Sequence, residues 1–300
     1  MTTAIKKVAF WSVTGLGLLL ALGATAGARQ SSDEKQILVT VMNLKTGNPI
    51  PGVTAANLGI KEDGKDREIV KVEPASGPVS VVLLADTTDT MKIYQNELKA
   101  TAKGFIAAMM AKVPGSSISL WQFGGAGVPV TQFLTDAAAL TEEAGKLRPR
   151  DVVSGVSAAG SNLLEGVVDG AKALGKRTET RRAIVSFNTL TASEGSKVQK
   201  SNVVSELQKN GVAWYGVSFA DGGTASGMRD SLMSEVMPMS GGIRLNVSDV
   251  ARIEGAVKAL ADIIGSQYLV TYKRSGSAKE VAVEVKAEGA RAFHARWAPK

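Results

Sequence analysis

The fold of this chain is decided by the stretch Val81-Val82-Leu83-Leu84-Ala85-Asp86-Thr87-Thr88-Asp89-Thr90-Met91. It begins with an unbroken apolar run, which is typical of a central strand that is buried on both faces of a sheet. The residues after this run are short and polar, and a helical pattern then extends over 91–112. A buried strand that passes through a polar turn into a helix is the basic unit of an α/β fold.

Strand and helix patterns alternate beyond this first unit. Strands are predicted at 117–123, 128–133, 183–187 and 212–219. Helices are predicted at 162–174 and 198–209, and a last helix is predicted to begin at a Ser248 cap and to end at Gly265. Because strands and helices alternate, we expect a doubly wound, mostly parallel sheet with helices on both faces.

Both ends of the chain show a different pattern, in which short strands follow one another without helices between them. These strands are predicted at 37–42, 58–61, 67–72, 267–272, 280–285 and 290–297. We therefore expect the α/β part to be inserted in one small β unit that is formed by both chain ends. The predicted parts are 29–78 for the N-terminal β segment, 79–265 for the α/β domain and 266–300 for the C-terminal β segment.

The N-terminus has the features of a secretory signal peptide, predicted over residues 1–28. Two lysines precede an apolar segment over 8–22, and two sites of the form A-x-A follow it, ending at Ala26 and Ala28. The alternative is an uncleaved anchor, since residues 8–28 are nearly long enough to span a bilayer. Membrane contact is expected only through this segment, if it stays uncleaved. Both interpretations place the rest of the chain outside the cytoplasm: secreted, in the periplasm or in the cell envelope.

The composition argues against several classes of site. The chain has no Cys and one His, His294, which excludes thiolate chemistry and argues against a His-rich zinc site or a Ser-His-Asp triad. No base–nucleophile pair is recognisable, so we expect no enzymatic activity. Aromatic residues are only 5%, and without residues 1–28 the net charge is 33 − 28 = +5. Together with export, this mild charge argues against a nucleic-acid partner.

The turn after the buried strand is the candidate functional site. In an open α/β sheet, ligands bind beyond the carboxyl ends of the strands, where this turn offers the carboxylate of Asp86 and the hydroxyls of Thr88 and Thr90. Hard oxygens of this kind suit Mg²⁺, Ca²⁺ or Mn²⁺. The alternative is that these residue types merely cap the helix that follows, which they do well.

The stretch 81–91 resembles the first strand and the metal-site turn of von Willebrand factor type A domains, whose motif is D-x-S-x-S or a Thr variant of it. Gly160-Ser161-Asn162-Leu163 resembles the loop that supplies a further hydroxyl in these domains. The flanking segments 52–58 and 266–272 resemble those of exported bacterial proteins related to the family. The resemblance implies a metal-ion-dependent adhesion site with Asp86, Thr88, Thr90 and Ser161 as its ligands, and no other cofactor.

One departure from the family pattern weakens the expected site. The family places a second aspartate directly after the strand predicted at 183–187, whereas this chain has Asn188 and Thr189 there. With fewer charged ligands, Mg²⁺ or Ca²⁺ should bind weakly. Restoring the acid at either position should strengthen binding.

Two functions remain open from the sequence. The first is an exported, non-enzymatic protein-binding module of the adhesion type, in which a degenerate divalent-metal site receives an acidic group of an unidentified protein partner. The alternative is a structural scaffold of the cell envelope with an inactive metal site. The intact Asp86, Thr88 and Thr90 favour the first function, and the substitution at Asn188 and Thr189 favours the second.

Overall fold

A computed structural model describes residues 33–124, 127–149, 162–192, 194–219, 227–274 and 276–299, which belong to one compact unit. The predicted signal peptide and the candidate ligand Ser161 lie outside these described residues. Within the described ranges, no helix combines the length and the apolar character that are needed to cross a membrane.

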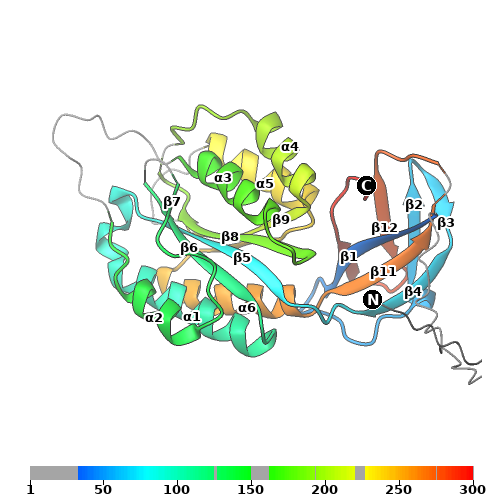
Figure 1. The fold of residues 1–300 in the computed structure, drawn as a ribbon, viewed down its shortest axis with the longest axis horizontal. Helices are drawn as coiled ribbons and strands as arrows, with labels where there is room; N and C mark the ends of the chain where they lie inside the picture. Colours follow the sequence, from blue (N-terminus) through cyan, green and yellow to red (C-terminus); the bar gives the residue numbers. More distant parts are fainter. Residues whose placement is uncertain are drawn as a thin grey trace, which may run out of the picture. The chain divides into compact units, whose positions relative to one another are not determined.

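The central sheet has six strands in the order β10-β9-β8-β5-β6-β7 (Figure 1). All strand pairs in it are parallel except the short antiparallel pair of β6 and β7. The strands are β5 (Val79–Asp86), β6 (Ser117–Phe123), β7 (Val128–Pro129), β8 (Arg181–Thr189), β9 (Val212–Phe219) and β10 (Arg244–Val247). Every residue of β5 is buried, as expected for a strand that lies between β6 and β8.

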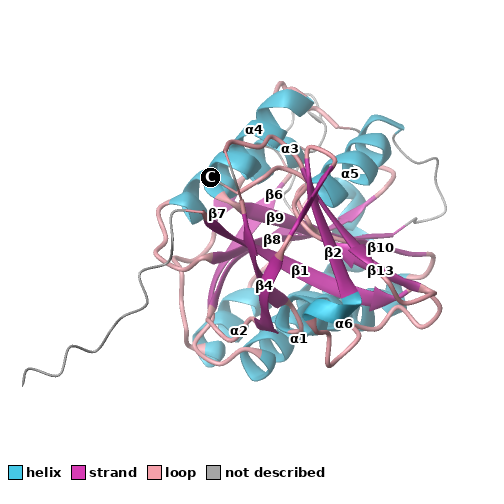
Figure 2. Cartoon of the chain, turned by 90° about the vertical axis from the view of Figure 1, so that its right-hand side faces the viewer, coloured by secondary structure: helices cyan, strands magenta, loops and turns pink. Residues whose placement is uncertain are grey.

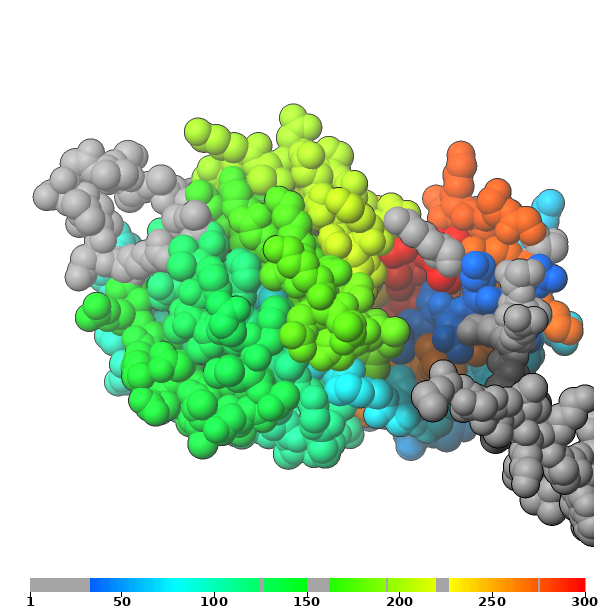
Figure 3. Space-filling model, viewed as in Figure 1, coloured from blue at the N-terminus to red at the C-terminus, as the bar shows by residue number. Residues whose placement is uncertain are grey.

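Helices cover both faces of this sheet. The first layer consists of α1 (Gln95–Lys112), α2 (Ala137–Gly145) and α6 (Ile253–Gly265), and the second of α3 (Leu163–Gly175), α4 (Lys200–Asn210) and α5 (Gly227–Met239). Within β5, Val81 and Leu83 pack with the first layer and Val82 and Leu84 with the second, because side chains alternate along a strand. Figure 3 shows this part of the chain in space-filling form in the same view, with the residues of α2 and α3 in green. The predicted doubly wound sheet is thereby confirmed.

The two chain ends form one β unit of two small sheets (Figure 2). One sheet has the order β13-β1-β11-β4 and the other β12-β2-β3. Their strands are β1 (Glu34–Asn43), β2 (Leu58–Glu62), β3 (Lys65–Arg67), β4 (Ile69–Pro74), β11 (Tyr268–Lys273), β12 (Val281–Val285) and β13 (Ala290–Phe293). In the antiparallel pair of β1 and β11, Glu34 lies opposite Lys273. The predicted insertion of the α/β part in a β unit built from both ends is confirmed.

A buried ionic cluster lies inside the β unit, around Glu62. This side chain is 0% exposed and accepts hydrogen bonds from the Tyr272 hydroxyl at 2.6 Å, from Arg274 Nε at 2.7 Å and from Arg67 Nε at 3.2 Å. Burial alone would raise the pKa of Glu62, but the hydrogen bonds from Arg274 and Tyr272 and the two guanidinium charges lower it below its ordinary value. The cluster links β2, β3, β11 and the segment after β11.

Arg181 fixes the connections between the β unit and the α/β part. It is the first residue of β8 and is buried, and its Nη1 donates to the carbonyls of Ala75 at 2.8 Å and Gly77 at 2.6 Å. Its Nη2 donates to the carbonyl of Ile264 at 2.6 Å. One guanidinium thus holds the segment that enters β5 beside the segment that leaves α6.

Some boundaries and elements differ from the sequence-based expectations. The helix expected over 91–112 is divided into the 3₁₀ helix η2 (Asp89–Tyr94) and α1, and the strand expected at 128–133 is reduced to β7. The cap expected at Ser248 is wrong, because Asp249 accepts the hydrogen bond from Ala251 N, at 3.0 Å, at the start of the 3₁₀ helix η3 (Val250–Arg252). Helices α2 and α5 and strand β10 were not anticipated.

Candidate functional site

Three of the four residues predicted from the sequence lie together at the carboxyl end of β5. Asp86 ends the strand and is 0% exposed. Its Oδ1 accepts hydrogen bonds from the backbone N–H of Thr88 at 3.0 Å and from the Thr88 hydroxyl at 2.6 Å. The hydroxyls of Thr88 and Thr90 are 2.8 Å apart. The fourth residue, Ser161, is outside the described part of the chain.

Asn188 and Thr189 stand where the resemblance implies a second aspartate, and of these two Thr189 faces the cluster. Its backbone N–H donates to Asp86 Oδ2 at 3.2 Å, and its hydroxyl lies 3.3 Å from that of Thr90. Asn188 points to the other face of the sheet, since side chains alternate along β8, and its amide nitrogen lies 3.6 Å from the sulfur of Met233 on α5. Thr189 is therefore the residue opposite Asp86.

A buried arginine reaches Asp86 from α5. Arg229 is 1% exposed, and its Nη1 lies 3.7 Å from Asp86 Oδ2 and donates to the Thr189 carbonyl at 3.1 Å. Its Nε donates at 3.1 Å to Oε2 of Glu194, whose side chain is also buried. The Ser196 hydroxyl donates to the other oxygen of Glu194. The site therefore contains a carboxylate–guanidinium–carboxylate group that was not anticipated.

The electrostatics of the site follow from this group. Asp86 and Glu194 contribute two negative charges and Arg229 one positive charge, so the sum is −2 + 1 = −1. Burial is the largest influence and leaves the pKa of both carboxyls above its ordinary value, while the guanidinium and the neighbouring hydrogen-bond donors offset part of this rise. The positive charge that favours the ionised form of these buried carboxyls is thus supplied by the protein itself, through Arg229.

The residues present do not fit a divalent ion in the way that the resemblance implies. Both oxygens of Asp86 are already engaged, by Thr88 on one side and by Thr189 and Arg229 on the other. A guanidinium 3.7 Å from the carboxylate also repels a second cation. Among the described residues, no three His, Cys, Asp or Glu side chains are arranged to hold a metal ion.

The sequence contained one signal for Arg229, which the sequence-based interpretation missed. Met233, Val236 and Met237 follow Arg229 at the spacing of one helix face, and all three are buried in the second helix layer. This spacing places Arg229 on the buried face of α5. Glu194 gave no comparable signal, since a single acid in a polar loop is usually solvated.

Two exposed apolar side chains flank the site. Ile93 lies in η2, directly after the Asp86 turn, and is 78% exposed; Met228 precedes Arg229 in α5 and is 63% exposed. They are more exposed than the other large apolar side chains found exposed in the described part of the chain. The ring of Tyr94, next to Ile93, packs edge-on against Phe219 at the end of β9, with 5.1 Å between the ring centres. Both apolar residues therefore belong to elements that border the carboxyl end of the sheet.

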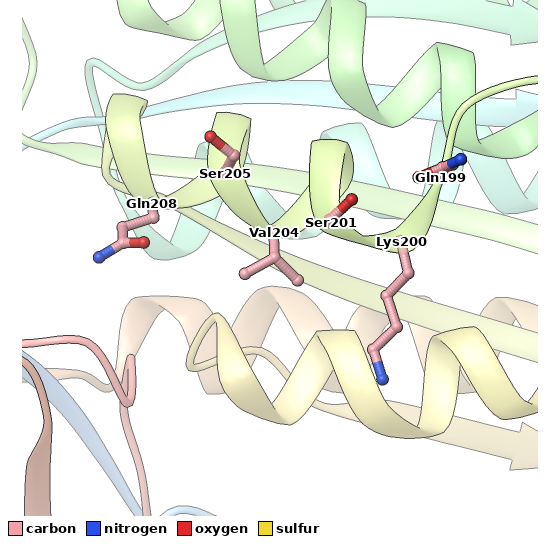
Figure 4. A pocket seen from close by; sticks show the side chains of 6 residues that line it. All are labelled: Gln199, Lys200, Ser201, Val204, Ser205 and Gln208. Carbon is pink, nitrogen blue, oxygen red and sulfur yellow. The ribbon is translucent and has the colours of Figure 1, made fainter.

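A separate groove of about 570 Å³ runs along α4 (Figure 4). It is shallow, and apart from Val204 it is lined by polar side chains: Gln199, Lys200, Ser201, Ser205 and Gln208. Lys200 extends over α5 and pairs with Glu235. The groove contains none of the residues of the Asp86 site.

His294, the one histidine of the chain, lies in the β unit and not at the Asp86 site. It accepts a hydrogen bond from Val283 N at 3.0 Å.

Comparisons with known proteins gave matches only among solved structures: no family model and no curated protein matches the sequence. A von Willebrand factor type A protein from Catenulispora acidiphila is similar over 90% of this chain and 75% of its own, with 10% identity and a TM-score of 0.52. Proximal thread matrix protein 1 from the mussel byssus is similar over 66% of this chain, with 11% identity and a TM-score of 0.50. This chain spans about half of the mussel protein's length, 49%. At this low identity, the likeness concerns the fold.

Proposed function

Since the α/β part of this chain has the von Willebrand factor type A fold, we propose that the chain is a non-enzymatic protein-binding module. Its binding surface is the carboxyl edge of the sheet, around the Asp86 turn. The observation that carries this proposal is the exposure of Ile93 and Met228 on the two elements that border this edge. Surfaces that a protein partner covers expose apolar side chains within a polar rim, and methionine is enriched in them.

The partner that fits this edge is a protein segment with an apolar contact surface. Ile93 and Met228 supply separate apolar contacts, and Met228 is flexible enough to adapt its shape to a partner. The second candidate function is a scaffold of the cell envelope. It is favoured by the Arg229 contact with Asp86, which leaves the edge without the free carboxylate that a metal-dependent adhesion site uses.

Site-specific photo-crosslinking tests the binding surface. A photo-reactive residue at position 93 or 228 is expected to form a discrete adduct with one partner protein in the cells that make this chain. Leu44 and Val70 are exposed apolar residues of the β unit and serve as control positions, from which that adduct should not form. Equal adducts from all four positions, or none from 93 and 228, would refute the proposed surface.

Substitution of the same side chains measures their contribution. Ile93→Ser and Met228→Ser are each expected to weaken binding of the crosslinked partner by about tenfold, because contact residues of this kind contribute about 1–2 kcal/mol. The free energy of unfolding should change by less than about 0.5 kcal/mol, since both side chains are exposed. Calorimetric titration and urea unfolding separate the two effects. Unchanged affinity in both variants would argue for the scaffold function.

Export is part of the same proposal. Residues 1–28 are proposed to direct secretion, so the mature protein should begin at Gly27 or Arg29, after one of the two A-x-A sites. N-terminal sequencing of the exported protein checks this. A protein that keeps Lys6 and Lys7 and sediments with membranes would instead carry an uncleaved anchor.

A further inference from the structure

We propose that the guanidinium of Arg229 takes the place of the divalent cation at the Asp86 site, so that the site is complete without a metal ion. This inference is independent of the proposed protein partner, because protein stability rather than binding reports on it. It rests on the contacts of Arg229, on its position in α5 and on the charges around it.

The contacts of Arg229 are those of a bound cation. Among the described residues, its polar partners are oxygens from three parts of the chain: Asp86 at the end of β5, the carbonyl of Thr189 at the end of β8, and Glu194 in the following loop. A cation at the Asp86 turn would use the same carboxylate. The guanidinium carries one positive charge and can only donate hydrogen bonds, so like a metal ion it binds oxygen atoms.

The position of Arg229 in the helix supports this interpretation. It lies in the first turn of α5, where the positive end of the helix dipole disfavours a cation. Burial adds a second unfavourable contribution, since a desolvated guanidinium needs a negative partner. Its Nη2 has no hydrogen-bond partner among the described residues. The two carboxylates, rather than a complete set of hydrogen bonds, therefore account for its placement.

Packing determines where the charge lies. Met233 and Met237 follow Arg229 by one and two turns of α5 and are buried against the sheet together with Val236. This packing fixes the start of α5 over the end of β8. Arg229 is consequently directed at Asp86 by the fold itself, and a free ion would have to compete with a cation that is covalently part of the protein.

Removal of the arginine should uncover a metal site. Wild-type protein is expected to show no change in melting temperature when millimolar MgCl₂ or MnCl₂ is added. Arg229→Met removes the charge and keeps an apolar side chain of similar length, so two buried carboxylates then lack a cation. This variant is expected to melt at a lower temperature than wild type and to regain about 3 °C or more with either metal, because an ion that binds only the folded state stabilises it.

Two further variants separate the charge effect from packing. Asp86→Asn combined with Arg229→Met removes both members of the pair, and this double variant should melt above Arg229→Met and should not respond to metal. Arg244→Met is the control: the side chain of Arg244 is only 6% exposed and pairs at 2.7 Å with the half-exposed Asp230 of α5, but it makes no hydrogen bond or ion pair with Asp86. It should lose stability without gaining a response to metal.

The outcomes divide clearly. A metal response in Arg229→Met that is absent from wild type and from the double variant supports the inference. A wild-type response equal to that of Arg229→Met overturns it, because the ion then binds beside the arginine. No response in a folded Arg229→Met also overturns it. If Arg229→Met does not fold, recovery in the double variant supports the inference, and failure of both overturns it in favour of a packing role.

Discussion

Asp86→Asn is expected to lower the free energy of unfolding by about 3–5 kcal/mol, which is the cost of removing one partner of a buried ion pair. Among the described residues, Arg229 would keep Glu194 as its only carboxylate. In the wild-type protein, one oxygen of Asp86 accepts hydrogen bonds from Thr88 and the other accepts one from Thr189. The amide of asparagine has a single acceptor oxygen, so one of these two sets of hydrogen bonds would be lost. Urea unfolding monitored by tryptophan fluorescence measures the change.

The neighbouring aspartate supplies the control for this substitution. Asp89 is exposed and pairs with Lys92 at 3.0 Å on the protein surface. Asp89→Asn should therefore change the free energy of unfolding by less than about 0.5 kcal/mol. If both variants unfold at the same urea concentration, the ion pair of Asp86 and Arg229 does not stabilise the folded protein.

Glu62→Gln should cause a loss of similar size, about 3–5 kcal/mol, in the β unit. The substitution leaves the guanidinium of Arg274, which is buried, without its carboxylate, and it also weakens the contacts of Arg67 and Tyr272. Glu68→Gln is the control, since Glu68 pairs with Lys273 at 2.9 Å on the surface. A loss in Glu62→Gln no larger than in Glu68→Gln would show that the buried cluster is energetically neutral.

The pH dependence of stability gives a second measurement on Glu62. Its pKa is lower in the folded protein than its ordinary value of 4.5, so the unfolded chain binds the proton more readily. The contribution of Glu62 to stability is therefore complete above about pH 4.5 and is lost as the pH falls through the lowered pKa. Glu62→Gln should accordingly show a weaker loss of stability between neutral and acidic pH than wild type.

The strands of the central sheet were predictable because their burial leaves a direct trace in the sequence. The apolar run at 81–85 lies within β5, and 183–187 lies within β8. Helix α5 was harder to recognise, since its apolar residues are mainly methionines and it begins with polar residues around Arg229. Strand β10 is only four residues long and none of them is fully buried, so its pattern is weak.

The site was predictable as far as it is local. Asp86, Thr88 and Thr90 lie on one turn, so their sequence spacing already brings them together. The contact between Glu194 and Arg229 joins residues that are 35 positions apart, and the contact between Asp86 and Thr189 spans 103 positions. No local pattern indicates which acid in a polar loop turns inward. The sequence shows that positions 188 and 189 lack a carboxylate. It does not show that Glu194 and Arg229 bring a negative and a positive charge to the same edge of the sheet.

The pairing of β1 has a consequence for the order in which the chain folds. Both neighbours of β1 in its sheet, β11 and β13, come from the C-terminal segment, and β4 also pairs only with β11 in that sheet. The six strands of the central sheet need no partner outside residues 79–247. During synthesis, β1 and β4 therefore emerge first but remain without partners until Tyr268 and the residues after it have been made. Contacts of such long sequence separation form slowly, and unpaired strand edges promote aggregation. Chains released before β11 is complete are thus expected to be the species that aggregates.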